Sequence, residues 1–142
     1  MAGAGELQVT VAALVFTTRE KDYGGVHLGV RAADARRLHQ LLESISRAQP
    51  GHTRRLAISR DAAVLAGQIF PRGRFSALTS LRLQRADRVR VSIEARAGVV
   101  ELTAAAARAA GDRVAMSDTT GGDSCIVGDS GAWTDRLWIW PL

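Results

Sequence analysis

The residues with the clearest capacity for chemistry lie near the C-terminal end of the chain, in the run Gly128-Asp129-Ser130-Gly131. A serine becomes a nucleophile when a neighbouring base accepts its proton and a third group orients that base. The bases available are His27, His39 and His52. A catalytic role for Ser130 therefore depends on whether one of these histidines suits it.

This stretch resembles the nucleophile segment of trypsin-like serine peptidases, in which Gly-Asp-Ser-Gly follows shortly after Asp-Ser-Cys, here Asp123-Ser124-Cys125. The resemblance implies an oxyanion-hole role for Gly128 and a nucleophilic role for Ser130. It covers nine residues and departs from the family, because one extra residue precedes Gly128 and Ala132 replaces the second glycine. No histidine stands in the family's sequence surroundings, and 142 residues are too few for its two barrels. We interpret the stretch as a surface loop and predict no catalytic residue.

The chain contains residues that can bind a metal ion, but they are not spaced as the ligands of a metal site are. Cys125 is the single cysteine. His27 is expected on the polar side of a strand, His39 at the border of a helix stripe and His52 in a loop. The C-terminal carboxylates lack the close alternate spacing and final Glu of a calcium loop; they are Asp118, Asp123, Asp129 and Asp135. The sequence therefore predicts no metal site and no cofactor.

Positive charge is concentrated in residues 50–96, which carry ten basic and three acidic groups. Nine of the basic residues form a dense arginine series: Arg54, Arg55, Arg60, Arg72, Arg74, Arg82, Arg85, Arg88 and Arg90. Because arginine binds phosphate in a fork, Arg-dependent nucleic-acid binding is one predicted function, with Arg82, Arg88 and Arg90 as phosphate-binding residues. Strand alternation places Arg82 and Arg90 on the same face as Glu94 and Glu101, so that face is expected to be mixed in charge.

The three tryptophans lie in the last ten residues, beside an acidic stretch at 112–135; they are Trp133, Trp138 and Trp140. Tryptophan is enriched at binding hot spots. Trp133 is predicted to anchor a protein partner, with Asp123 and Asp129 presenting negative potential to a basic partner surface. The competing outcome is that this stretch folds back onto the protein's own arginines. Whether Trp138 and Trp140 fill the core or form an interface stays open.

One helix is predicted from about Asp34 to Ser46, because its apolar residues recur at three- and four-residue spacing. These residues are Ala35, Leu38, Leu41, Leu42 and Ile45. Arg36, Gln40, Glu43 and Arg47 fall on the opposite face, and Gln49-Pro50-Gly51 ends the helix. Its apolar stripe requires a surface to cover it, and the rest of the chain predicts that this surface is a sheet.

Strands are predicted where apolar residues alternate, at about 7–16, 26–30, 55–59, 81–102 and 136–140. Within 81–102 a meander is expected, with a loop at Ala86–Arg88 and a two-residue turn at Ala97-Gly98. This register pairs Ile93 with Leu102 and places Leu83 across from Val91. Residues 118–135 are expected to form a long polar loop. The segments 61–67 and 104–110 could each be strand or helix.

The predicted fold is α+β, a single domain over residues 1–142 in which one main helix packs on a mainly antiparallel sheet of about five to seven strands. No segment predicts a secretory signal or a membrane helix, so a cytoplasmic protein is expected. Without a catalytic constellation, the leading prediction is a small non-catalytic protein-binding module. Adaptors, chaperones and immunity proteins are analogies of size and chemistry only. The oligomeric state stays open.

Overall fold

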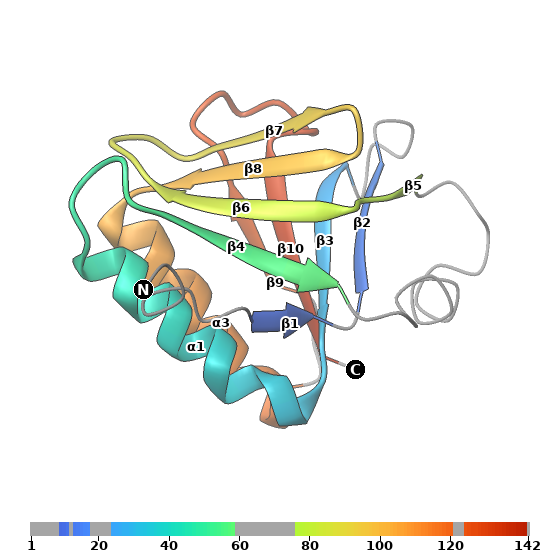
Figure 1. The fold of residues 1–142 in the computed structure, drawn as a ribbon, viewed down its shortest axis with the longest axis vertical. Coiled ribbons are helices and arrows are strands. Elements are labelled where there is room, and N and C mark those ends of the chain that lie inside the picture. The colour runs from blue at the N-terminus through green and yellow to red at the C-terminus, as the bar shows by residue number, and fades with distance from the viewer. Residues whose placement is uncertain (1–8, 12, 18–23, 59–75, 121–123, 142) are drawn as a thin grey trace, which may run out of the picture.

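The computed structural model describes residues 9–11, 13–17, 24–58, 76–120 and 124–141 of the chain. In these residues ten strands form two five-stranded sheets, and two helices, α1 (Ala32–Arg47) and α3 (Ala104–Thr120), lie side by side against them (Figure 1). The α+β class is confirmed, but it contains a second helix that the sequence did not predict. In the described part of the chain, neither helix is long and apolar enough to cross a membrane.

The first sheet, sheet A, contains in spatial order β1 (Val9–Val11), β4 (Thr53–Ile58), β6 (Ser80–Arg85), β8 (Ala97–Leu102) and β7 (Arg90–Glu94). The second, sheet B, contains β5 (Ser76–Ala77), β2 (Ala13–Thr17), β3 (Gly25–Val30), β10 (Arg136–Pro141) and β9 (Ser124–Val127). Figure 1 shows the strands of sheet A running across those of sheet B. Both sheets are mixed, because β1–β4, β6–β8 and β3–β10 are parallel pairs and the other five pairs are antiparallel, so the predicted antiparallel sheet is confirmed only in part.

The meander predicted for residues 81–102 is wrong in its strand order. β8 lies between β6 and β7, so Leu83 and Val91 are not neighbours; each stands opposite Val100 instead. β6 and β8 run parallel, which no hairpin could produce. The chain therefore passes from β6 to the sheet edge at β7 before it returns as β8.

The turn between β7 and β8 lies at Ala95-Arg96, two residues before the predicted position. Ile93 consequently pairs with Gly98 instead of Leu102. The register differs by an even number of residues, and an even shift leaves every side chain on its original face. The predicted faces are therefore right although the predicted pairs are wrong.

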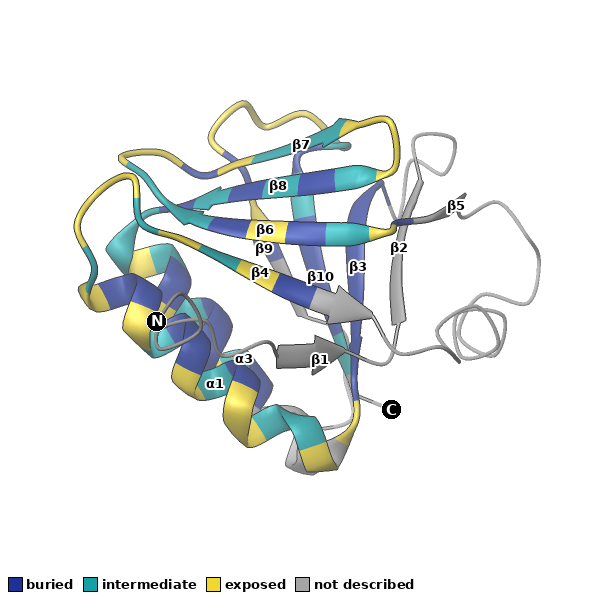
Figure 2. Cartoon of the chain, viewed as in Figure 1, coloured by how far each residue is buried: buried dark blue, intermediate teal, exposed yellow. Residues whose placement is uncertain are grey.

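The helix predicted from about Asp34 to Ser46 is confirmed as α1. Its apolar stripe is buried against the sheets and α3, as the dark residues on its inner side show in Figure 2. Leu38, Leu41, Leu42 and Ile45 are each at most 4% exposed. α1 is thus a packing element of the core.

The second helix, α3, occupies the segment 104–110 that the sequence left undecided and continues to Thr120. Thr103 caps it, since its Oγ1 accepts a hydrogen bond from the N–H of Ala106 (3.1 Å). His39 of α1 donates from Nδ1 to the Gly111 carbonyl of α3 (2.8 Å). The predicted loop at 118–135 is wrong, because α3 and β9 occupy part of it. The remaining segment, residues 128–135, is here called the 128–135 loop. Segment 61–67 lies outside the described residues.

Candidate functional site

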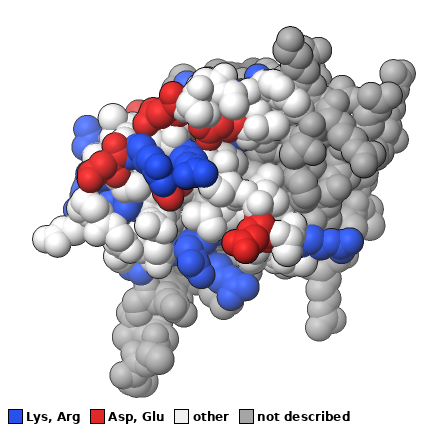
Figure 3. Space-filling model, turned by 90° about the horizontal axis from the view of Figure 1, so that it is seen from above, with Lys and Arg blue, Asp and Glu red and all other residues white. Residues whose placement is uncertain are grey.

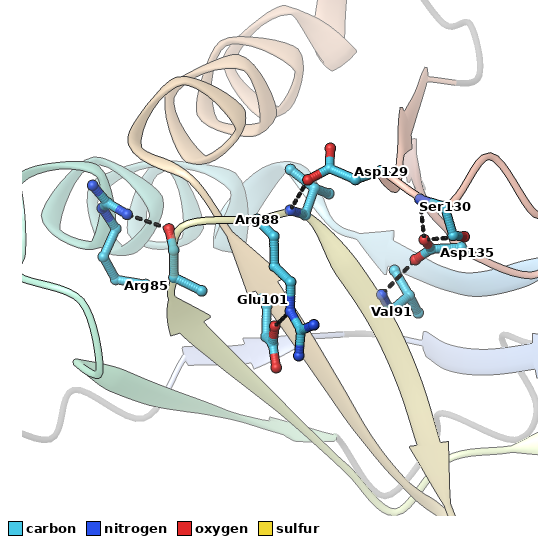
Figure 4. A network of polar contacts seen from close by, with 9 residues as sticks. Arg85, Arg88, Val91, Glu101, Asp129, Ser130 and Asp135 are labelled. Carbon is cyan, nitrogen blue, oxygen red and sulfur yellow. Dashed lines mark hydrogen bonds and ion pairs between the residues drawn. The ribbon is translucent and has the colours of Figure 1, made fainter.

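Asp135 is a buried carboxylate, 6% exposed, that fastens the 128–135 loop to the edge of sheet A. Its Oδ1 accepts a hydrogen bond from the main-chain N–H of Val91 in β7 (2.6 Å) (Figure 4). Its Oδ2 accepts from the Ser130 hydroxyl (2.6 Å) and from the Ser130 N–H (3.3 Å). Gly128 leaves room for this carboxylate, because a Cβ there would lie about 2 Å from it. Three donors converge on one carboxylate, so the loop and β7 are held together.

Asp129 makes a second connection, to the main chain of Val89, the residue that precedes β7. Its N–H donates to the Val89 carbonyl (2.9 Å), and its Oδ2 accepts from the Val89 N–H (3.0 Å). The two carboxylates described in this region therefore bind the protein's own main chain. This favours the competing outcome, in which the acidic stretch folds back on the protein. Asp123 lies outside the described residues, so its predicted partner contact stays a prediction.

The Ser130 hydroxyl donates to Asp135 and accepts a hydrogen bond from the Ala132 N–H (3.2 Å). The histidines lie elsewhere: His39 joins α1 to α3, His52 lies in the turn before β4, and His27 accepts from Trp140. Among the described residues no imidazole shares a hydrogen bond with Ser130. The local contacts of Ser130 are those of a residue that stabilises a loop.

A groove of about 490 Å³ runs between the edge of β7 and the 128–135 loop. Its lining includes Arg88, Arg90, Val91, Asp129 and Thr134. The structure thus brings together Asp129, predicted as a partner contact, with two of the three arginines predicted to bind phosphate. The third, Arg82, lies on β6, two strands away from β7 in sheet A.

The two groove arginines differ in how they are engaged. Arg88 donates from Nε to Glu101 (2.6 Å), and this hydrogen bond and the charge of Glu101 raise the pKa of the Arg88 guanidinium; the charge of Asp129 acts in the same direction. Arg90 also stands opposite Glu101 in the register, but Glu101 is bonded to Arg88. Arg90 is exposed and has no acidic partner among the described residues. Figure 3 shows basic and acidic side chains interspersed on this side of the molecule.

β7 is the end strand of sheet A. Only some of the main-chain N–H and C=O groups on its outer side have hydrogen-bond partners among the described residues. In an antiparallel pair successive residues turn their N–H and C=O alternately toward and away from the neighbour. The Val91 N–H points away from β8, toward Asp135, so the N–H and C=O of Ile93 must point outward as well. Within the described residues neither Ile93 group has a hydrogen-bond partner. The 128–135 loop therefore pairs with the first half of this edge, and no other described residue pairs with the second half.

The outer face of sheet A is polar and carries a second arginine pair. Arg55 of β4 stands directly opposite Arg82 of β6, and both are exposed. Like charges in this position destabilise a sheet by up to about 1 kcal/mol. Arg90 and Glu101 lie on the same face, so the predicted mixture of charges is confirmed. Arg60, Arg72 and Arg74 lie outside the described residues.

Trp138 and Trp140 lie away from the groove, on β10 of sheet B. Leu137 and Ile139 of β10 enter the core, so alternation turns Trp138 and Trp140 to the opposite face. There His27 is 1% exposed and stacks on Trp138 with ring centroids 5.4 Å apart. The expectation that His27 faces solvent is wrong, because the strand face that carries it is covered by these rings.

Trp133, the predicted partner anchor, is half-buried. A Cβ on Gly24 would lie 2.1 Å from its ring, so the ring packs against the main chain at Gly24. Its carbonyl accepts a hydrogen bond from Arg136 Nε (2.7 Å). Part of its surface is therefore used within the protein, and its contact with a partner stays a prediction.

The site residues that the sequence did not identify are Val89, Val91 and Ile93, which act through their main chain. Side-chain patterns carry no signal for such groups. No protein-family model matches the chain, and no curated protein is similar to it.

Proposed function

We propose that this chain is a small, non-catalytic protein-binding module that receives an extended segment of a partner along the open edge of β7. One observation carries the proposal. Among the described residues the outward N–H and C=O of Ile93 have no partner at the edge of sheet A, on the strand whose Arg90 and Val91 line a groove of about 490 Å³. An exposed strand edge of this kind is a template for an added strand.

The 128–135 loop supports this mode of binding, because Asp129 already pairs with both main-chain groups of Val89. A partner segment would continue the same pairing at Ile93. Main-chain hydrogen bonds would supply affinity, and the side chains along the groove would supply specificity. Arg90 is exposed without an acidic partner among the described residues, so a carboxylate in the segment would complement it.

Two substitutions at one position test the proposal. Linear peptides selected from a random display library serve as the probe, and their affinity is measured by fluorescence anisotropy. Ile93→Pro removes the outward N–H but spares the ladder between β7 and β8, since proline is tolerated at such edge positions. Ile93→Ala is the matched control, because it shortens the same side chain and keeps the N–H.

We expect Ile93→Pro to weaken peptide binding about tenfold or more, the value of a lost hydrogen bond near 1.4 kcal/mol, and Ile93→Ala to weaken it much less. Arg90→Glu should also weaken binding of acidic peptides, whereas Arg96→Glu, in the exposed turn after β7, should not. Equal affinity of the proline and alanine variants, with both folded, contradicts strand addition at β7.

The second candidate function is Arg-dependent nucleic-acid binding, and the Arg55–Arg82 pair favours it. Two adjacent guanidinium groups without a carboxylate between them suit a phosphate of the backbone. For a single-stranded oligonucleotide, the magnitude of the log–log salt slope should then fall by about 0.7 when both arginines become glutamine, since one phosphate contact contributes about 0.7. A slope unaffected by this double substitution removes the second candidate.

A further inference from the structure

A second concave site lies where α1 ends and β4 begins, and β4 is three strands away from β7 in sheet A. It is an open hollow of about 660 Å³, lined by Ser44, Arg47, Gln49, His52 and Arg54, among others. We call it the α1-end pocket. It shares no lining residue with the groove beside β7.

The turn that forms one wall of the pocket is fixed by the main chain. The Gly51 N–H donates to the Arg85 carbonyl (2.7 Å), and the Arg85 N–H donates to the His52 carbonyl (2.8 Å). The His52 N–H closes the turn on the Gln49 carbonyl (3.2 Å). The wall is therefore formed before any ligand arrives, which lowers the entropy cost of binding.

The side chains around the pocket are cationic without a countercharge. Arg47 and Arg54 carry guanidinium groups, and no carboxylate is among the lining residues. Glu43, one turn earlier on α1, is bonded to His39 (3.2 Å). Neither arginine forms an ion pair among the described residues.

Arg54 is the most informative of these residues. It lies on the same side of β4 as the buried Leu56 and is itself half-buried. Its only described hydrogen bond is a long one, 3.4 Å, to the neighbouring Thr53 carbonyl. This bond lies at an exposed part of the side chain, so the Arg54 guanidinium is accessible to an anion.

The end of α1 opposes an anion to some degree, because a helix C-terminus carries roughly half an elementary negative charge. Two guanidinium groups outweigh it, each with a full positive charge. The Ala48 N–H already bonds the Ile45 carbonyl (3.1 Å), which satisfies one of the terminal acceptors. The two arginines give the lining residues a positive net charge.

We propose that the α1-end pocket binds a small molecule bearing a phosphate group, held in the forks of Arg47 and Arg54. Arginine matches the geometry of phosphate oxygens with two parallel hydrogen bonds. The Gln49 amide could add a further donor, and the volume leaves room for more than the phosphate itself. The ligand class is therefore a phosphate ester or a diphosphate.

The test uses the whole chain with pyrophosphate as the probe, followed by calorimetry and by the His52 imidazole signals in NMR spectra. We expect one saturable site. Arg47→Gln and Arg54→Gln should each weaken binding about tenfold or more, the value of a lost charge-assisted hydrogen bond. Arg36→Gln is the control, because Arg36 is an exposed arginine on the same helix that does not line the pocket.

Arg54 is half-buried, so its substitution requires a check of folding; Arg47 is exposed and supplies the second variant. Comparing methyl phosphate with adenosine monophosphate distinguishes two sources of the same group. Equal affinities identify the phosphate itself as the ligand, and tighter binding of the nucleotide identifies a nucleotide. Absence of saturable binding at millimolar pyrophosphate, or equal affinity in the Arg47, Arg54 and Arg36 variants, overturns the proposal.

Discussion

Replacing Asp135 by alanine should separate the 128–135 loop from β7. The substitution removes the acceptor for the Val91 N–H (2.6 Å) and for two donors of Ser130. A hydrogen bond to a charged group contributes about 1.5–3 kcal/mol. Ser130 is exposed and can turn to water, so its bonds should count for less than the Val91 bond. We expect a loss of about 2–4 kcal/mol in the free energy of unfolding.

More conservative substitutions should lower the free energy of unfolding by less than Asp135→Ala does. Asp135→Asn keeps an acceptor for Val91 but sets an amide N–H₂ against the Ser130 N–H, and should cost about 1–2 kcal/mol. Asp129→Asn alters an exposed residue with one described side-chain bond, to the Val89 N–H, and should cost about 1 kcal/mol or less. The expected order of destabilisation is therefore Asp135→Ala, then Asp135→Asn, then Asp129→Asn.

Urea unfolding followed by circular dichroism measures these values. Asp112→Ala, at an exposed position on α3, is the control and should stay within about 0.5 kcal/mol of the wild type. Amide exchange at Val91 should accelerate in Asp135→Ala, because its N–H loses its acceptor. If Asp135→Ala matches the control, or if Asp129→Asn is the more damaging change, the carboxylate does not join the loop to the sheet and this reasoning is refuted.

Three further outcomes follow from the packing. Leu42→Ala should lower the free energy of unfolding by about 2–5 kcal/mol in urea, since Leu42 is 2% exposed; an unchanged midpoint contradicts its place in the core. Gly128→Ala should destabilise more than Gly131→Ala, because a Cβ at 128 meets the Asp135 carboxylate. A Cβ at 131 meets nothing within 4 Å, and its cost is only the backbone strain of a side chain at φ 71°. The same urea series decides, and the reverse order would contradict a fixed position of the Asp135 carboxylate. Ser130 should remain unlabelled by fluorophosphonate probes in mass spectrometry, and stoichiometric labelling would establish it as a nucleophile.

The parts of the fold that the sequence predicts well depend on local periodicity. The 3.6-residue spacing of α1 identifies both its limits and its buried face. Alternation in β6, β7 and β8 identifies which side chains face the core, since face depends only on parity. Neither pattern says which strand lies beside which. The position of β8 between β6 and β7 depends on contacts between residues far apart in the sequence.

The missed elements lack such a local signal. α3 begins in a run of alanines, where no apolar stripe stands out, and Thr103 as its N-cap is the only clear sign of a helix start. The sequence pattern places His27 on the polar side of a strand, yet His27 is buried by tryptophans more than a hundred residues away in the chain. The open edge at Ile93 exists because β7 ends a sheet, and that is a property of topology.

The most direct test of the proposed function is the exchange rate of one amide, the Ile93 N–H, measured by NMR with and without a selected peptide. In the free protein this N–H has no described acceptor and should exchange rapidly. A bound segment that pairs with β7 should slow it by about tenfold or more, while the Ser92 N–H, already turned toward β8, stays slow. Saturating peptide that leaves the Ile93 exchange rate unchanged would contradict strand addition at this edge.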